Sequence, residues 1–273
     1  MMNNAEERVS KFYNTVGWET EFGITEDARR FEDLRECARE YVSKCRLRVL
    51  RHIPDNGVNM LDMASGPIQY KEYLEYSGNF EKRYCVDLSS GALEEAKKKI
   101  GDHGVFLHGS FFSTPLEENF FDCAVSLHTI YHIDKDKQED VVRKLIYVTK
   151  PGKPVIIVYS NPNALISFLR LPFHLLRKIK RVLKKSDSKM KLEEDFSLYY
   201  HAHPIEWWAR FSDIASVKIL PWRSFESATQ KMIPNNKIGR KMFDVLFNME
   251  DRFPYFFVKH FQYPMIILNK IKI

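Results

Sequence analysis

The stretch NMLDMASGPIQY, residues 59–70, decides the fold. It reads as an apolar strand followed by a tight turn whose single glycine is Gly66. In an open α/β sheet, ligands bind beyond the carboxyl ends of the strands, so a ligand site is expected on this turn. Pro67 lacks a backbone N–H and suits the first position of a helix, which would leave residues 64–66 presenting N–H groups to a ligand.

Strand-like and helix-like runs alternate along the chain after this stretch. Near-continuous apolar strands separated by helices indicate a parallel sheet that is covered on both faces. We expect strands over 58–63, 82–87, 104–108, 121–127 and 153–159, and helices over 67–76, 89–100 and 136–149.

The rest of the chain divides into flanking segments. Residues 5–53 are predicted to be mostly helical, and a helix over 205–211 with strands over 215–220 and 256–268 would finish the sheet with a pair that need not be parallel. We expect four regions: an N-terminal helical cap (1–57), a ligand-binding core (58–160), a basic helical insertion or lid (161–204) and a completion of the core sheet (205–273).

The glycine pattern of the turn argues against a dinucleotide. The dinucleotide fingerprint needs three glycines, and Ala64, Gly66 and Gln69 occupy those places. Asp87 ends the second strand 21 residues beyond Gly66, where an acid accepts hydrogen bonds from both ribose hydroxyls. The two features together favour a ligand that carries adenosine but no phosphates.

Four segments in order resemble the successive motifs of class I S-adenosylmethionine-dependent methyltransferases (methyltransferase type 11/25-like). They are NMLDMASGPIQY, KRYCVDLSSGALEEAKKKI, FLHGSFFSTPLEENFFDCAVSLHTIYHI and KPGKPVIIVYSN, and KFYNTVGWE near the start resembles the cap helix of that family. The resemblance covers about residues 8–160. It implies a Rossmann-like, mostly parallel seven-stranded sheet and S-adenosylmethionine as cofactor, with S-adenosylhomocysteine as product.

The resemblance also implies cofactor-binding residues. Ala64, Ser65 and Gly66 would lie beside the methionyl part, Asp87 on the ribose, and Leu88, Ser110 and Phe111 around the adenine. Two positions depart from the family pattern, because Ala64 replaces the usual glycine and Ser110 stands where an aspartate often reads the adenine amine. The remaining cofactor-binding candidates are Tyr13, Asp62 and Leu127.

The segment SLHTIYHID, just past the fourth strand, offers histidines where the methyl acceptor is expected. If the acceptor is a hydroxyl, a base should take its proton, and histidine is the usual choice near neutral pH. His132 is the preferred catalytic candidate and His128 the second. The spacing of the two histidines also admits a metal reading, but without the usual glutamate or cysteine partners we expect no metal. The candidates for binding the acceptor are Trp18, Tyr131, Tyr200 and His203.

Charge and cysteine content limit the partners. Residues 170–191 hold nine Lys or Arg against one Asp, a local charge of +8, whereas the whole chain carries +6. This segment predicts an amphipathic basic helix, read as a lid helix or as a contact to a membrane surface, an anionic lipid or an anionic substrate. The four scattered cysteines indicate a reducing compartment, and we expect a cytoplasmic protein without a signal peptide or a spanning helix.

The sequence therefore predicts a methyltransferase that acts on a small molecule, with oxygen as the favoured acceptor atom. A lipid or quinone methyltransferase that docks on membranes through the basic helix is one alternative. A nicotinamide-dependent oxidoreductase and a binding protein without turnover are two others. Nucleic acid is not an expected partner, because LHTI stands where exocyclic base methyltransferases carry an Asn- or Asp-Pro-Pro-aromatic turn.

Overall fold

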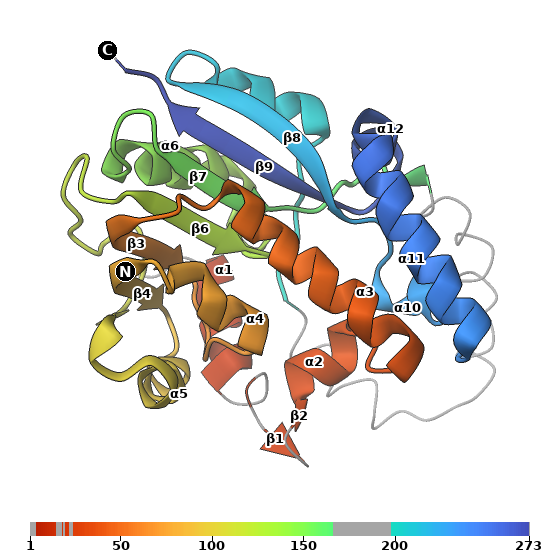
Figure 1. Ribbon diagram of the computed structural model, residues 1–273. Coiled ribbons are helices and arrows are strands. Elements are labelled where there is room, and N and C mark those ends of the chain that lie inside the picture. Colours follow the sequence, from red (N-terminus) through yellow and green to blue (C-terminus); the bar gives the residue numbers. More distant parts are fainter. Residues whose placement is uncertain (1–3, 15–17, 19, 22–23, 166–197, 273) are drawn as a thin grey trace.

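In the computed structural model, which describes residues 4–14, 18, 20–21, 24–165 and 198–272, seven strands form one sheet. They are β3 (Gly57–Met63), β4 (Phe80–Asp87), β5 (Gly104–His108), β6 (Cys123–Leu127), β7 (Pro154–Val158), β8 (Ala215–Arg223) and β9 (Tyr263–Lys270). Their order across the sheet is β5-β4-β3-β6-β7-β9-β8 (Figure 1). β9 runs antiparallel to both of its neighbours, β7 and β8, and all other adjacent strands are parallel. The chain turns in opposite directions on leaving β3 and β6, so the crevice at their carboxyl ends is where this sheet offers a binding site.

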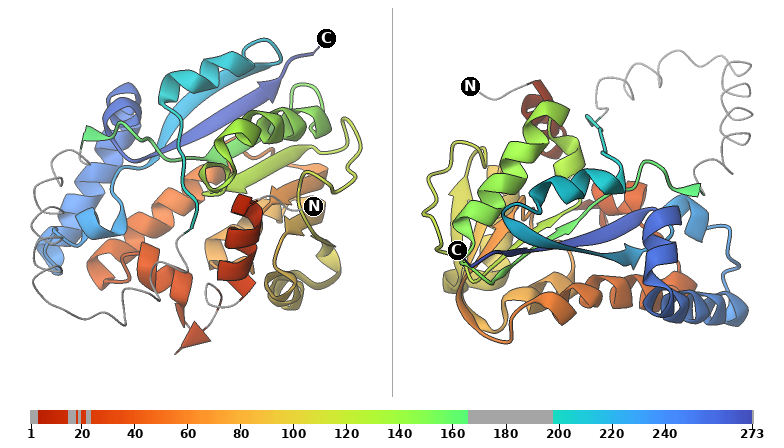
Figure 2. Two further views of the ribbon diagram at one scale, coloured as in Figure 1. Left: turned by 180° about the vertical axis from the view of Figure 1, so that it is seen from behind. Right: turned by 90° about the horizontal axis from the view of Figure 1, so that it is seen from above.

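Both faces of the sheet are apolar, because successive residues of each buried strand point to opposite sides. On one face Leu61 and Met63 pack with α6 (Gln138–Val148) and the 3-10 helix η7 (Ile205–Phe211). On the other face Met60, which directly precedes Leu61 in sequence, packs with the 3-10 helix η2 (Arg48–His52). The views in Figure 2 show the green α6 on one side of the sheet and orange helical segments on the other.

Further helices complete these layers. α5 (Ser90–Ile100) packs against Cys85 of β4, which shares its face with Met60. The remaining short elements are α4 (Lys71–Leu74), η3 (Glu75–Ser77), η4 (Gly101–His103), η5 (Ile130–His132) and η6 (Lys135–Lys137).

The N-terminal part of the chain consists of three helices and a hairpin. They are α1 (Asn4–Phe12), β1 (Thr20–Glu21), β2 (Ile24–Thr25), α2 (Glu26–Phe31) and α3 (Glu36–Leu47). The Thr25 hydroxyl accepts from the N–H of Ala28 at 3.2 Å and thereby caps α2. α1 lies near η5, at the carboxyl end of the sheet, whereas α3 packs on the opposite side of the molecule against α11 (Lys237–Arg252).

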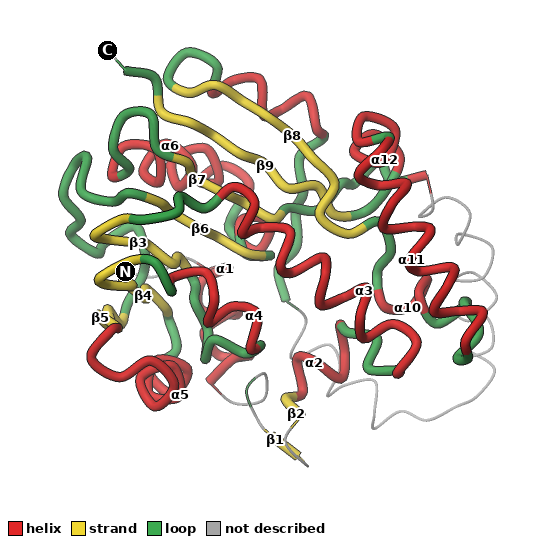
Figure 3. Tube along the Cα trace, in the orientation of Figure 1, coloured by secondary structure: helices red, strands yellow, loops and turns green. Residues whose placement is uncertain are grey.

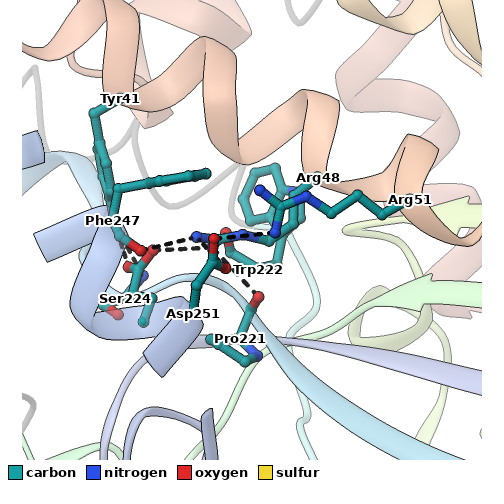
Figure 4. Close-up of polar contacts among 9 residues, drawn as sticks. Tyr41, Arg48, Arg51, Pro221, Trp222, Ser224, Phe247 and Asp251 are labelled. Carbon is teal, nitrogen blue, oxygen red and sulfur yellow. Dashed lines mark hydrogen bonds and ion pairs between the residues drawn. The ribbon is translucent and has the colours of Figure 1, made fainter. Parts of the chain in front are cut away.

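A helical excursion connects β8 to β9. It contains α10 (Ser227–Gln230), α11 and α12 (Pro254–His260), shown as red coils beside the yellow strands in Figure 3. A buried carboxylate anchors it: Glu250 of α11 pairs with Arg48 at 2.9 Å and accepts from the Tyr41 hydroxyl at 2.6 Å and from the Ser224 N–H at 2.9 Å. Figure 4 shows this network between α3, η2, α11 and the end of β8.

Three expected elements differ from the structure. The helix predicted from Pro67 begins only at Lys71, because residues 64–70 form an irregular turn with left-handed backbone at three positions. Residues 256–260 of the predicted last strand belong instead to α12, since Pro254 occupies the first turn of a helix. The helix over 205–211 is a 3-10 helix. The basic segment 170–191 and most of the expected lid, 161–204, lie outside the described residues.

The predicted completion of the sheet by a late strand pair is confirmed, and the pair is antiparallel. The predicted mostly parallel Rossmann-like sheet is confirmed as well. Among the described helices, none is both long and apolar enough to cross a membrane.

Candidate active site

The turn after β3 is held in an uncommon backbone conformation. Ala64, Gly66 and Ile68 have φ values of +57°, +55° and +49°. Such values suit glycine and strain other residues by about 1–2 kcal/mol. Gly66 is also required for space, because a Cβ there would lie 2.9 Å from the Trp18 ring. The turn is thus tight, strained and covered by an indole from the N-terminal segment.

Asp87, at the end of β4, is bound to this turn. One carboxylate oxygen accepts the N–H of Gly66 at 2.8 Å, and the other accepts the N–H of Ser89 at 2.8 Å. Burial raises the pKa of Asp87 to about 6, against the opposing effect of these two hydrogen bonds. Each oxygen has used one acceptor position, so both can still accept a hydroxyl.

Asp62 has a different environment from the other predicted cofactor-binding residues. Its carboxylate forms a buried ion pair with Arg83, and Arg83 also donates to the Tyr73 carbonyl at 2.6 Å. Both ends of the pair line the cavity described next. The charge of Asp62 is therefore already compensated within the protein.

The carboxyl ends of the strands enclose a cavity of about 450 Å³. It brings together fourteen of the sixteen predicted site residues. They are Tyr13, Trp18, Asp62, Ala64, Ser65, Gly66, Asp87, Leu88, Phe111, Leu127, His128, Tyr131, His132 and Tyr200. The rings of Tyr13 and Trp18 stack with centroids 4.8 Å apart, so both aromatic candidates of the cap form one wall of the cavity.

Ser110 and His203 do not line this cavity. Ser110 donates its hydroxyl to the carboxylate of Glu6 and lines a smaller neighbouring hollow. His203 stacks on Trp207, with ring centroids 4.4 Å apart and planes at 3°. His203 is thus placed for packing, and Ser110 for linking α1 to the loop after β5.

His132 is arranged as a proton acceptor. Its Nδ1 lies 2.6 Å from the carbonyl oxygen of Tyr199, which can only accept, so Nδ1 carries the proton and Nε2 keeps its lone pair. Burial lowers the pKa of His132, and the hydrogen bond to Tyr199 opposes that shift. The ring is therefore neutral at pH 7.

His128 is more deeply held and pairs with a tyrosine. Its φ is +58°, and its Nδ1 lies 3.0 Å from the hydroxyl of Tyr131. Burial, followed by the charge of Arg223, lowers the pKa of His128 well below its ordinary value. The ring is also wedged between Trp222 and Tyr263, which fixes its orientation. His128 and Tyr131 thus line the cavity as a hydrogen-bonded pair.

The sequence did not reveal six of the charged residues that line the cavity, among them Asp27, Glu32 and Arg223. Arg223 is buried and pairs with Glu32 at 2.6 Å. Burial, followed by the charge of Glu32, raises the pKa of Asp27 to about 6. Arg223 ends β8, and a strand predicted to reach it instead of stopping at residue 220 would have marked it as a strand-end candidate. Neither acid had such a signal, because both fall in a helical charge pattern.

No grouping of three or more metal-ligating side chains occurs in the part of the chain that the structure describes. The polar groups of the cavity are instead carboxylates, tyrosines, histidines and two paired arginines.

The chain matches a known protein family in sequence and known structures in fold. The family model of the methyltransferase domain matches residues 61–157. No curated protein matches the sequence. Geranyl diphosphate C-methyltransferase from Streptomyces coelicolor A3(2), solved with S-adenosylhomocysteine, is similar with a TM-score of 0.57 and 12% identity over 98% of each chain. A SAM-dependent methyltransferase from Archaeoglobus fulgidus gives a TM-score of 0.53 and 16% identity, over 85% of this chain and 94% of that one.

A third similar structure is phosphoethanolamine N-methyltransferase 2 from Haemonchus contortus in complex with S-adenosyl-L-methionine. Its TM-score is 0.52 and its identity 14%, over 84% of this chain and 53% of the other, so this chain spans about half the length of that protein. At such identities the likeness concerns the fold. Together with the domain match it confirms the predicted class: the chain carries a methyltransferase domain in the fold of class I S-adenosylmethionine-dependent methyltransferases.

Proposed function

We propose that this protein transfers the methyl group of S-adenosylmethionine to a small-molecule acceptor, with oxygen as the favoured acceptor atom. The observation that carries the proposal is the hydrogen bond between Gly66 and Asp87. It joins the turn after β3 to the end of β4 on one wall of the cavity. These are the two places that the sequence assigned to an adenosyl group.

The donor groups of the cavity fit a cofactor without phosphates. Asp87 offers two carboxylate oxygens to a pair of hydroxyls, as a ribose requires. The cavity has two arginines, Arg83 and Arg223, and each is already paired with an acid, Asp62 or Glu32. A pyrophosphate would need uncompensated cations or several free N–H groups, so the charges favour S-adenosylmethionine over a nicotinamide dinucleotide.

The aromatic wall fits the positive charge of this cofactor. When bound, S-adenosylmethionine supplies an electrophilic methyl group on a sulfonium. Tyr13 and Trp18 present stacked rings to the cavity, and an aromatic face stabilises a cation by about 0.5–2 kcal/mol. We assign Tyr13 to the cofactor and Trp18 to the boundary between cofactor and acceptor.

His132, Tyr131 and Tyr200 would hold and deprotonate the acceptor. Methyl transfer is an in-line displacement, so the rate depends mainly on holding the acceptor close and excluding water. His132 would take the proton from an acceptor hydroxyl at Nε2. Tyr200, whose hydroxyl lies 2.8 Å from that of Ser160, would orient the acceptor molecule. The four cysteines are free and buried, which supports a reducing compartment such as the cytoplasm.

Two measurements test this proposal. In calorimetric titration, S-adenosylhomocysteine should bind and NAD should not; the reverse result would overturn the cofactor assignment. Methyl transfer from labelled S-adenosylmethionine should then be compared for paired acceptors that differ only in a hydroxyl or an amine. Labelling of the amine members alone would refute the oxygen assignment and leave the cofactor assignment intact.

A further inference from the structure

An exposed apolar face covers the helical excursion between β8 and β9. Half of the sixteen large apolar side chains that are exposed in the described part of the chain fall between residues 232 and 256. They are Met232, Ile238, Met242, Val245, Met249, Phe253, Tyr255 and Phe256. Single exposed apolar residues are normal on a protein surface, but a contiguous set marks an interaction site. We call these eight residues the α11 face.

Four residues of the α11 face belong to α11 itself, a helix that is apolar on two sides. Ile238, Met242, Val245 and Met249 recur at steps of four, three and four residues, which places them in one stripe along α11. Another side of the helix carries the buried Phe243 and Glu250 and is fixed against α3 and η2. The outer stripe is therefore not needed to hold α11 in place.

Basic residues surround the α11 face without compensation. Lys231, Lys237, Lys241, Arg252 and Lys259 are exposed and form no ion pair within the described residues. The three acids between residues 231 and 260 all pair with basic residues of α3 and η2: Asp244 with Lys44, Glu250 with Arg48, and Asp251 with Arg48 and Arg51. The face thus presents apolar side chains that are flanked in sequence by unpaired positive charges.

We propose that the α11 face docks on an anionic lipid surface. An apolar stripe flanked by lysines, with phenylalanine and tyrosine at one end, is the pattern of helices that lie in a membrane interface. A second copy of the chain would bring the same lysines against each other. The chain's own basic segment, 170–191, has the same sign of charge and would also be repelled. Lipid phosphates are the partner that satisfies both the apolar and the charged part.

The position of the face connects docking with the cavity. The excursion that carries it leaves β8 at Arg223 and returns to β9 at Tyr263, and both residues line the cavity. The excursion that carries the face is therefore attached to the sheet at two residues of the cavity wall. The proposal concerns binding only, and it stands whether or not the proposed methyl transfer is correct.

Vesicle sedimentation of the full chain, without cofactor or acceptor, tests the proposal. The protein should pellet with vesicles of equal parts phosphatidylcholine and phosphatidylglycerol and stay in solution with phosphatidylcholine alone. The double variant Lys237→Gln/Lys241→Gln should bind about 25-fold more weakly, from about a fivefold effect for each lysine. A control pair elsewhere, Lys97→Gln/Lys218→Gln, removes the same charge and should bind as the unmodified protein does.

A second variant separates the apolar part. Met242→Gln/Val245→Gln changes only exposed side chains, so this variant should fold normally but lose vesicle binding. Tyr147→Gln, which changes an exposed side chain of α6, should fold normally and keep vesicle binding. Undiminished binding of both double variants would overturn the proposal and assign the binding to another segment. A dimer in sedimentation velocity that Met242→Gln/Val245→Gln dissociates, without any vesicle binding, would overturn it in favour of an interface between copies.

Discussion

Trp18 lies directly over Gly66, so closely that a Cβ on this glycine would approach the indole to 2.9 Å. The contact ties the N-terminal segment to the turn that follows β3. It makes Gly66 necessary on two counts, left-handed backbone and space.

Gly66→Ala should therefore weaken S-adenosylhomocysteine binding and lower stability by at least about 1 kcal/mol, the usual cost of a side chain in left-handed backbone. Calorimetry and urea denaturation measure the two effects. Gly91→Ala is the matched control, because Gly91 lies in α5 with nothing near its missing Cβ. This control should stabilise the protein by about 0.5–1 kcal/mol. Equal behaviour of the two variants would mean that the indole contact is unimportant.

Asp87→Asn should abolish binding of S-adenosylhomocysteine while the fold persists. Asparagine keeps the shape and one acceptor oxygen, but its NH₂ group would face a backbone N–H or a ribose hydroxyl position. Asp87→Ala is a poorer test, because it would leave the N–H groups of Gly66 and Ser89 without their acceptor. Calorimetric titration of the folded variant decides the matter, and unchanged affinity would remove Asp87 from the cofactor site.

The acids of the cavity should make stability depend on pH. Burial raises the pKa of both Asp87 and Asp27 to about 6 from an ordinary value of 3.8, so the folded state binds protons more tightly than the unfolded state. Protonation of these acids therefore contributes to the free energy of unfolding. This contribution is fully present below pH 3.8 and is lost as the pH rises through 6, and for Asp87 it amounts to about 3 kcal/mol. The free energy of unfolding should fall less between pH 4 and pH 7 in Asp87→Asn/Asp27→Asn than in the unmodified protein. Identical pH profiles would contradict this account.

His132→Gln should lower turnover by about 10²- to 10⁴-fold, the usual contribution of a positioned base, with cofactor affinity retained. Because burial lowers the pKa of His132, the acid limb of the wild-type rate profile should lie below pH 6.5, and the variant should lack it. His203→Gln is the control, since His203 stacks on Trp207 outside the cavity. Wild-type turnover of the His132 variant would exclude the histidine as the base.

Glu250→Gln should destabilise the protein by about 3 kcal/mol, because it removes the buried carboxylate from Arg48 and leaves this arginine with the partly exposed Asp251 as its remaining acid. Glu139→Gln, which breaks an exposed pair with Arg143, should cost less than about 1 kcal/mol. Urea denaturation compares the two. Similar losses would show that the Glu250 network adds no more than a surface pair.

The sheet and one wall of the cavity were predictable because their signals are local. Short, mostly apolar segments mark the buried strands, and Asp87 directly follows the apolar residues 84–86 at the end of such a segment. The left-handed backbone of Ala64 was not predictable, because alanine has no preference for it. The Arg223–Glu32 pair joins residues 191 positions apart, and only the finished fold brings them together.

The paired strands β8 and β9 have a consequence for how such chains diversify. Their ladder runs from Ala215 opposite Lys270 to Arg223 opposite Tyr263, so the intervening helices depart and return at adjacent points. We expect that other helices could replace this region, provided that α3 and η2 change with it, without shifting the strands that carry Gly66 and Asp87. Such an exchange would alter the outer surface of the protein while the turn after β3 and the end of β4 keep their geometry.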